Sequence, residues 1–143
     1  MEIICYLFII LFVYAAAGKL LDFEEFRVQL GQSPMLSEFA DYVVWALPAM
    51  EIGVAILLSS AKLRLIGIFA FFSLMVMFTT YIVIILNFTD FIPCSCGGVL
   101  ANLGWIEHLI FNVVFIILAI ITVVLESSRR TEKYLVFQKF ILK

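Results

Sequence analysis

Charged side chains are scarce in this chain of 143 residues. Lys, Arg, Asp and Glu together make up 14%, and hydrophobic residues make up 65%. An ordinary soluble domain is nearer half apolar and a quarter charged. The net charge is −2, and the chain has no basic stripe with interleaved aromatic residues, so the sequence argues against nucleic acid as a partner. The composition excludes an ordinary soluble domain and favours a membrane protein.

Cysteine and histidine are scarce too. The chain has three cysteines and one histidine, and three cysteines are too few for a disulfide scaffold. A lone histidine, His108, does not supply both axial ligands of a haem. Together with Cys94 and Cys96 it makes three metal ligands where a closed zinc site has four. We therefore predict no metal site.

The apolar residues that are present come in four long runs. They cover residues 3–21, 42–60, 65–88 and 105–125, and about 20 apolar residues in a helix span the hydrocarbon core of a bilayer. The first run offers Glu2 and no Lys or Arg before it, which argues for a membrane helix over a secretory signal. The sequence predicts one all-α domain over residues 1–143, an integral membrane four-helix bundle followed by a cytoplasmic tail at 126–143.

The basic residues are distributed unevenly among the connecting segments. One side would hold Lys62, Arg64 and the five basic residues of the tail, whereas the other would hold Lys19, Arg27 and seven acidic residues. Because Lys and Arg are enriched on the cytoplasmic side, we expect both termini inside. The first loop and the loop at 89–104 then lie outside, which in a bacterial inner membrane is the periplasm.

Two segments outside the spans have helical spacing. Phe23, Phe26 and Leu30 recur among charged residues, which favours a short interfacial helix in the first outer loop, with a stop near Pro34 and a fresh cap at Ser37; a plain connector is the alternative. Residues 134–143 could form a second interfacial helix or a frayed terminus.

The loop at 93–98, PCSCGG, carries the reactive side chains. Cys94 and Cys96 are one residue apart and face the oxidising side, a position that suits thiol–disulfide exchange. A disulfide between them would be strained and easily opened. The alternative is a passive disulfide or two idle thiols. Cys5 lies at the opposite end of the first span, and we interpret it as a packing residue.

Three further residues are candidates for proton handling. Glu107 and His108 open the fourth span, close in sequence to the cysteines, and His108 could accept a proton or serve a bound quinone. Its alternative is an ordinary interfacial residue. Glu51 lies in the middle of the second span, where a carboxyl group needs a partner or a function; residues 79–81 on the third span are possible partners. Glu51 could instead pin two helices together.

Four segments resemble a known family. They are AGKLLDF at 17–23, WALPAME at 45–51, PCSCGG at 93–98 and GWIEH at 104–108. In this order they are similar to the DoxX-like superfamily of four-helix membrane proteins, and within it to the branch related to MauE. The resemblance implies redox maturation of exported proteins beside thioredoxin-like partners, on a plan similar to vitamin K epoxide reductase and DsbB. Those enzymes carry Cys-x-x-Cys and a second outer cysteine pair, which this chain lacks, so a separate protein would have to deliver or accept electrons.

The favoured hypothesis is a thiol–disulfide redox protein of the inner membrane. Cys94, Cys96, His108 and Glu107 are its candidate catalytic residues, Trp105 and Glu51 its candidate cofactor-binding residues, and quinone its candidate cofactor. The partner would be a periplasmic thioredoxin-like or exported protein. The alternative is a non-catalytic subunit of a larger membrane complex, in which the cysteine loop is a structural clasp. A channel built around Glu51 is a weaker third hypothesis.

Overall fold

The computed structural model describes the backbone of residues 2–33, 36–88 and 104–141, and the side chains of these ranges as far as 128. This part of the chain is helical and contains no strand. Four long helices cover the predicted runs: α1 (Glu2–Leu21), α3 (Ala40–Ser59), α4 (Arg64–Phe88) and α5 (Trp105–Ile141). Each is long and apolar enough to cross a membrane. The predicted all-α fold with four spanning helices is confirmed.

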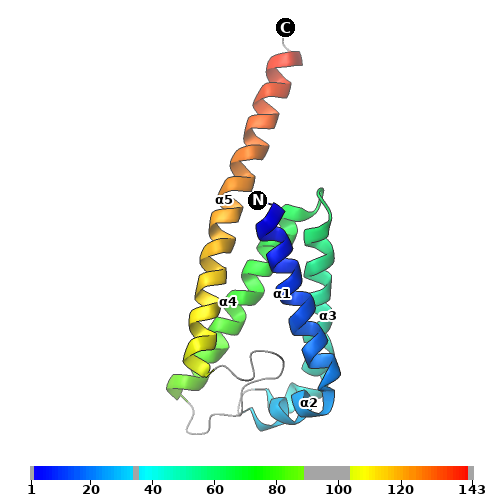
Figure 1. The fold of residues 1–143 in the computed structure, drawn as a ribbon, viewed down its shortest axis with the longest axis vertical. Coiled ribbons are helices and arrows are strands. Elements are labelled where there is room, and N and C mark those ends of the chain that lie inside the picture. The colour runs from blue at the N-terminus through cyan, green and yellow to red at the C-terminus, as the bar shows by residue number, and fades with distance from the viewer. Residues whose placement is uncertain (1, 34–35, 89–103, 142–143) are drawn as a thin grey trace.

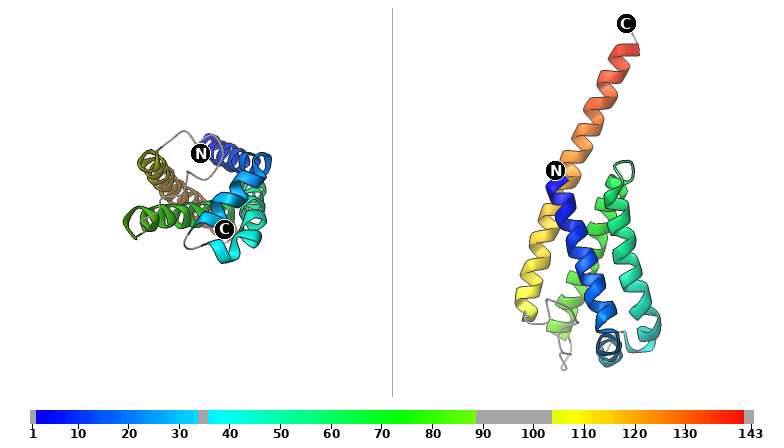
Figure 2. Two further views of the ribbon diagram at one scale, coloured as in Figure 1. Left: turned by 90° about the horizontal axis from the view of Figure 1, so that it is seen from below. Right: turned by 45° about the vertical axis from the view of Figure 1, so that its right-hand side comes forward.

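The long helices are arranged as two pairs. α1 packs along α3 and α4 packs along α5, and the contact between α3 and α4 joins the two pairs. Figure 1 shows the pairs close together at the N-terminal end of α1 and further apart at its other end. The view from below in Figure 2 shows the same separation of α1 from α5. The bundle is therefore tight at one end and splayed at the other.

An aromatic cluster fills the tight end. The rings of Phe8 and Phe71 stack with centroids 4.0 Å apart, and Phe12 lies 4.5 Å from Phe71. Phe115 of α5 tilts against Phe8 at 6.1 Å. Large rings bury much apolar surface and pack favourably in such tilted or offset arrangements. The cluster closes the interior of the bundle on this side.

A close approach of α3 and α4 accompanies the aromatic cluster. A Cβ atom added to Gly67 would lie 2.8 Å from the backbone nitrogen of Leu58 and 3.0 Å from the carbonyl carbon of Leu57. Only glycine fits at this distance. Gly67 thus allows the two backbones to meet just after the turn that connects them.

The short helix α2 (Phe23–Gln32) crosses the splayed end of the bundle, as Figure 1 shows. Phe26 and Leu30 are buried and pack with Ala40 and Val44 of α3. The hydroxyl of Tyr81 on α4 donates a hydrogen bond to Ser33 Oγ, with the two oxygens 2.9 Å apart. The predicted short helix of the first loop is confirmed, and these contacts attach it to both helix pairs.

The start of α3 differs from the prediction of a cap at Ser37. Ser37 begins a 3-10 helix, η1 (Ser37–Phe39), and α3 follows at Ala40. Phe39 occupies the capping position and its side chain makes no capping hydrogen bond. Because the tight turn of η1 leads directly into α3, the serine lies two residues before the capping position.

α5 continues beyond the predicted fourth span. It runs without interruption for 37 residues, about 55 Å at 1.5 Å per residue. The hydrocarbon core is about 30 Å thick, and Figure 1 shows the last part of α5 projecting beyond the other helices. The segment after residue 128 is therefore an extension of α5. Residues 134–141 are helical, and their position at the membrane interface stays a prediction.

Candidate functional site: a cavity with a buried ion pair

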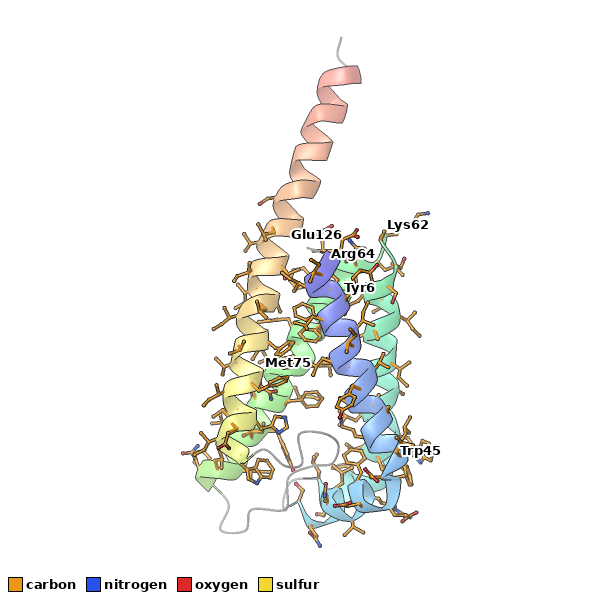
Figure 3. The ribbon with its side chains drawn as sticks, viewed as in Figure 1. Tyr6, Trp45, Lys62, Arg64, Met75 and Glu126 are labelled. Atoms are coloured by element: carbon orange, nitrogen blue, oxygen red, sulfur yellow. The ribbon has the colours of Figure 1, made fainter. Side chains whose placement is uncertain are left out.

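A cavity of about 640 Å³ lies in the splayed half of the bundle. All four long helices and α2 contribute to its lining, which is mostly aliphatic and aromatic. Met75, labelled in Figure 3, points from α4 into this interior. Ligand pockets in proteins commonly have volumes of about 300–1,000 Å³ and apolar walls with a few polar groups. Besides Tyr14 and Trp105, the side chains with polar groups that line this one are Lys19, Glu51, Tyr81, His108 and Asn112.

Lys19 and Glu51 form a buried ion pair in the cavity wall. Lys19 Nζ lies 2.8 Å from Glu51 Oε1, and the side chains are 10% and 1% exposed. Lys19 Nζ also donates to the carbonyl oxygen of Ala15 at 3.3 Å. Its aliphatic stem runs back along α1 by one turn, so that the ammonium group lies deeper than its Cα atom. The pair joins α1 to α3.

The partners expected for Glu51 on α4 were wrong. Thr79 and Thr80 donate their hydroxyl hydrogen bonds to the carbonyl oxygens of Met75 and Val76 in their own helix. Tyr81 bonds to Ser33. Because α1 packs along α3, the side chain that reaches Glu51 is the lysine at the end of the first span.

Two buried polar atoms of the cavity have no hydrogen-bond partner among the described residues. They are the second carboxylate oxygen of Glu51, Oε2, and the amide nitrogen of Asn112, Nδ2. Glu51 is 1% exposed and Asn112 is 3% exposed. A buried polar group without a partner costs about 1–3 kcal/mol, and more if it is charged. These two atoms, an acceptor on α3 and a donor on α5, are therefore polar groups of the cavity wall that a ligand can satisfy.

Asn112 was not among the residues selected from the sequence. It lies in the first half of α5 within an apolar stretch, and an amide at that depth has the same significance as an acid. The signal was present. An amide carries no charge, so it interrupts the apolar run less visibly than an acid or a base does.

His108 and Trp105 lie in the first turn of α5 and line the cavity. Both are partly buried. Glu107 is exposed and lies outside the cavity lining, with its carboxyl group folded back over Gly104, where an added side chain would collide with it. The structure thus brings Trp105 and His108 together with Glu51 around one cavity, and it leaves Glu107 outside the lining.

The cavity is not sealed from its surroundings. Leu7, Ile10 and Tyr14 of α1 line it and are themselves 44%, 65% and 45% exposed. Met50 on α3 is also both exposed and part of the lining. Because these residues lie within spanning helices, the cavity opens sideways, toward the apolar surroundings of the bundle.

Comparison with protein families assigns the chain to a family. A family model described as methylamine utilisation protein MauE matches residues 1–125. The chain belongs to the MauE family. No curated protein and no solved structure gave a significant match. The match and the four apolar helices make the chain a multi-pass membrane protein of a family that its description links to methylamine utilisation.

The two cysteines of this MauE-family chain that carry the predicted chemistry, Cys94 and Cys96, lie outside the described residues. Their loop is attached after Phe88 of α4 and before Gly104, both at the end of the bundle where α2 lies. Cys5 is buried in the aromatic end of the core, near Phe8. It lies toward the opposite end of α1 from Lys19, which agrees with the prediction that Cys5 is a packing residue.

Proposed function

We propose that this MauE-family protein is a thiol–disulfide redox protein of the membrane. Cys94 and Cys96 exchange electrons with a thioredoxin-like or exported protein, and a carrier bound in the cavity resets them. One observation carries the proposal. The cavity is lined by Trp105 and His108 at the start of α5, directly after the loop that holds the two cysteines.

The exchange reaction needs only the loop and its partner. In the oxidising direction, a thiolate of the partner attacks one sulfur of a Cys94–Cys96 disulfide and releases the other sulfur as a thiolate. The second partner thiol then resolves the mixed disulfide. The partner has lost two electrons and two protons, and the loop has gained them as two thiols. The reverse sequence reduces the partner.

The reset requires a two-electron acceptor or donor within reach of the membrane. The volume of the cavity, its apolar walls and its few polar side chains suit a quinone. Glu51 and Asn112 are the residues that would hold its polar end, and Trp105 would pack against it. A quinone, when bound, supplies a two-electron, two-proton acceptor, and its reduced form supplies the corresponding donor.

His108 is the proton carrier of this proposal. Its side chain is partly buried and lines the cavity, and it follows the cysteine loop by twelve residues from Cys96. Histidine is the side chain best suited to accept and release protons near neutral pH. Glu107 has no contact with the cavity, so its contribution is limited to the electrostatics of the first turn of α5, where an acid is favoured.

The location follows the same proposal. The N-terminal end of α1 and the α3–α4 connection lie at the end of the bundle opposite α2, and α5 projects beyond them on the same side (Figure 1). Lys62 and Arg64 lie at that end, and the projecting part of α5 carries Arg129, Arg130, Lys133 and Lys139. With the enrichment of Lys and Arg on the cytoplasmic side, we place both termini in the cytoplasm of a bacterium and the cysteine loop in the periplasm.

Trapping the mixed disulfide tests the exchange reaction. If one cysteine attacks and the other resolves, either Cys94→Ser or Cys96→Ser, but not both, should accumulate a covalent complex with its partner that disappears with reductant. The measurement is a non-reducing gel of membranes, and Cys5→Ser is the matched control, expected to behave as the parent. If neither variant traps a partner, and the double serine variant matures exported disulfide proteins as well as the parent, the loop is a structural clasp in a non-catalytic subunit.

A further inference from the structure

The volume of the cavity limits only the size of its ligand, whereas the two unpaired polar atoms indicate which chemical group the ligand carries at its polar end. We propose that Glu51 Oε2 and Asn112 Nδ2 form a head-group site for an apolar molecule that ends in a hydroxyl group. This inference deepens the proposed function, and rests on it, by specifying which form of a membrane carrier the cavity holds.

The first step concerns Glu51. Its Oε1 accepts a hydrogen bond from the Lys19 ammonium group at 2.8 Å, and we take the carboxyl group in this ion pair to be the carboxylate. A carboxylate only accepts hydrogen bonds. Its Oε2 is buried and unpartnered within the part of the chain that the structure describes. A ligand that satisfies Oε2 must therefore donate a hydrogen bond.

The second step concerns Asn112. Its Nδ2 carries two N–H donors, and among the described residues this atom, also buried, has no acceptor. Asn112 projects from α5 into the cavity that Glu51 lines from α3. The ligand must therefore also accept a hydrogen bond at its polar end.

A hydroxyl group meets both requirements, since it has one donor and two acceptor lone pairs. A carbonyl oxygen accepts from Asn112 but places a lone pair toward the carboxylate. An ether oxygen has the same defect. The site thus discriminates between molecules of the same apolar shape by the presence of one O–H group, and it favours the hydroxyl-bearing, reduced form of a quinone over the oxidised form.

The rest of the cavity is consistent with an apolar body on this head group. The lining around the polar side chains is dominated by residues such as Leu47, Phe78, Ile82 and Phe111. The exposed lining residues of α1 leave a way in from the side. A ligand that arrives through the bilayer therefore finds apolar walls first and the polar pair inside.

A matched pair of redox-inert probes tests the inference. The protein carries Cys94→Ser, Cys96→Ser and Trp45→Phe, which prevents thiol exchange and leaves Trp105 of the cavity as the sole tryptophan of two. Its fluorescence in lipid nanodiscs is titrated with 4-decylphenol and with 4-decylanisole, which differ in the hydroxyl hydrogen and a methyl group. A hydrogen bond to a charged acceptor contributes about 1.5–3 kcal/mol, so the phenol should bind about tenfold more tightly or better.

Two variants separate the roles of the two residues. Glu51→Gln removes the charge, and the phenol-to-anisole ratio should fall to about threefold or less. Asn112→Leu should weaken both probes and leave the ratio nearly unchanged, because both carry an oxygen that accepts. Ser73→Ala, at an exposed position of α4 that bonds its own helix, is the control and should change neither affinity.

Equal affinities for phenol and anisole in the starting protein would overturn the head-group site, and so would a ratio that Glu51→Gln leaves intact. The first comparison needs no further variant, so it stands even if a substitution prevents folding. A protein that traps mixed disulfides but fails here remains a redox protein with another carrier site. If the protein prefers the phenol but traps no mixed disulfide, it is a membrane protein that binds a hydroxyl-bearing ligand and has no thiol chemistry.

Discussion

At the scale of single residues, the Lys19–Glu51 pair is the most consequential feature of the bundle. An isolated charge inside a spanning helix costs several kcal/mol, whereas the two opposite charges at 2.8 Å compensate each other. Burial still removes both from water, so the pair contributes little net stability over two apolar residues of similar size. Its value to the protein is a fixed carboxylate in an apolar cavity.

A double-mutant cycle should show that the attraction between the two charges roughly offsets the cost of burying them. Lys19→Met should destabilise the protein by about 3–5 kcal/mol, because it leaves Glu51 buried and unpaired, and Lys19→Met with Glu51→Leu should recover most of that loss. The measurement is the thermal unfolding temperature in detergent. Arg27→Met is the control: Arg27 pairs with Asp41 at 2.8 Å, but the side chains are 50% and 73% exposed, so its loss should cost less than about 1 kcal/mol. A double variant as unstable as the single one would contradict the account.

The sequence predicted Glu51 as an intramembrane acid but not its partner. Hydropathy gives the depth of a Cα atom, and Lys19 is only two residues from the end of α1. Its long side chain carries the ammonium group back to the level of Ala15, about 6 Å deeper along the helix. The relevant signal was that, within the first three predicted spans, Lys19 is the only Lys or Arg and Glu51 the only Asp or Glu.

At the scale of helices, the contact between α3 and α4 holds the two pairs together. Gly67 allows the backbones to approach where any larger residue would collide with Leu58. Gly53, in α3, has open space where its Cβ atom would lie. Gly67 and Gly53 therefore have different reasons to be present.

Replacing each glycine by alanine should change the stability of the protein in a different way. Gly67→Ala should destabilise the protein by about 1–3 kcal/mol, because the helices must move apart. Gly53→Ala should be neutral or stabilising by up to about 1 kcal/mol, since alanine favours a helix over glycine. Thermal unfolding in detergent measures both. An effect of equal size and sign at the two sites would remove the close approach as the explanation.

The helices themselves were predictable because a bilayer demands about 20 apolar residues per span. Their pairing was not. The spans are apolar around most of their circumference, so the sequence has little amphipathic signal to show which face of α1 meets α3. The extent of α5 was also missed, since the polar residues after position 125 stop the apolar run without stopping the helix. The cysteine loop, at 93–98, was predicted from its motif and lies outside the described residues.

At the scale of the whole molecule, both ends of the bundle are chemically distinct. Lys62 and Arg64 lie at the same end as Glu126, as Figure 3 shows, and α2 with its acidic residues lies at the other. If the basic end is cytoplasmic, the α2 end faces outward.

Accessibility of single cysteines should settle the orientation. In a background with Cys5, Cys94 and Cys96 replaced by serine, Glu24→Cys should react with a membrane-impermeant thiol reagent in intact spheroplasts. Lys62→Cys should react only after the membrane is opened. Both positions are exposed, so burial does not explain a difference between them. The opposite pattern would invert the topology and place the cysteine loop in the cytoplasm.

Because the cavity opens sideways, the ligand concentration that determines binding is the one in the bilayer. Leu7, Ile10 and Tyr14 are exposed along the cavity and lie within a spanning helix, so an apolar molecule reaches the site from the lipid phase. The occupancy of the site then depends on the mole fraction of ligand in the bilayer. The aqueous concentration of the ligand matters only because the partition coefficient relates it to that mole fraction. A longer alkyl tail should lower the apparent Kd measured against total aqueous ligand, yet leave the mole fraction at half-saturation nearly constant.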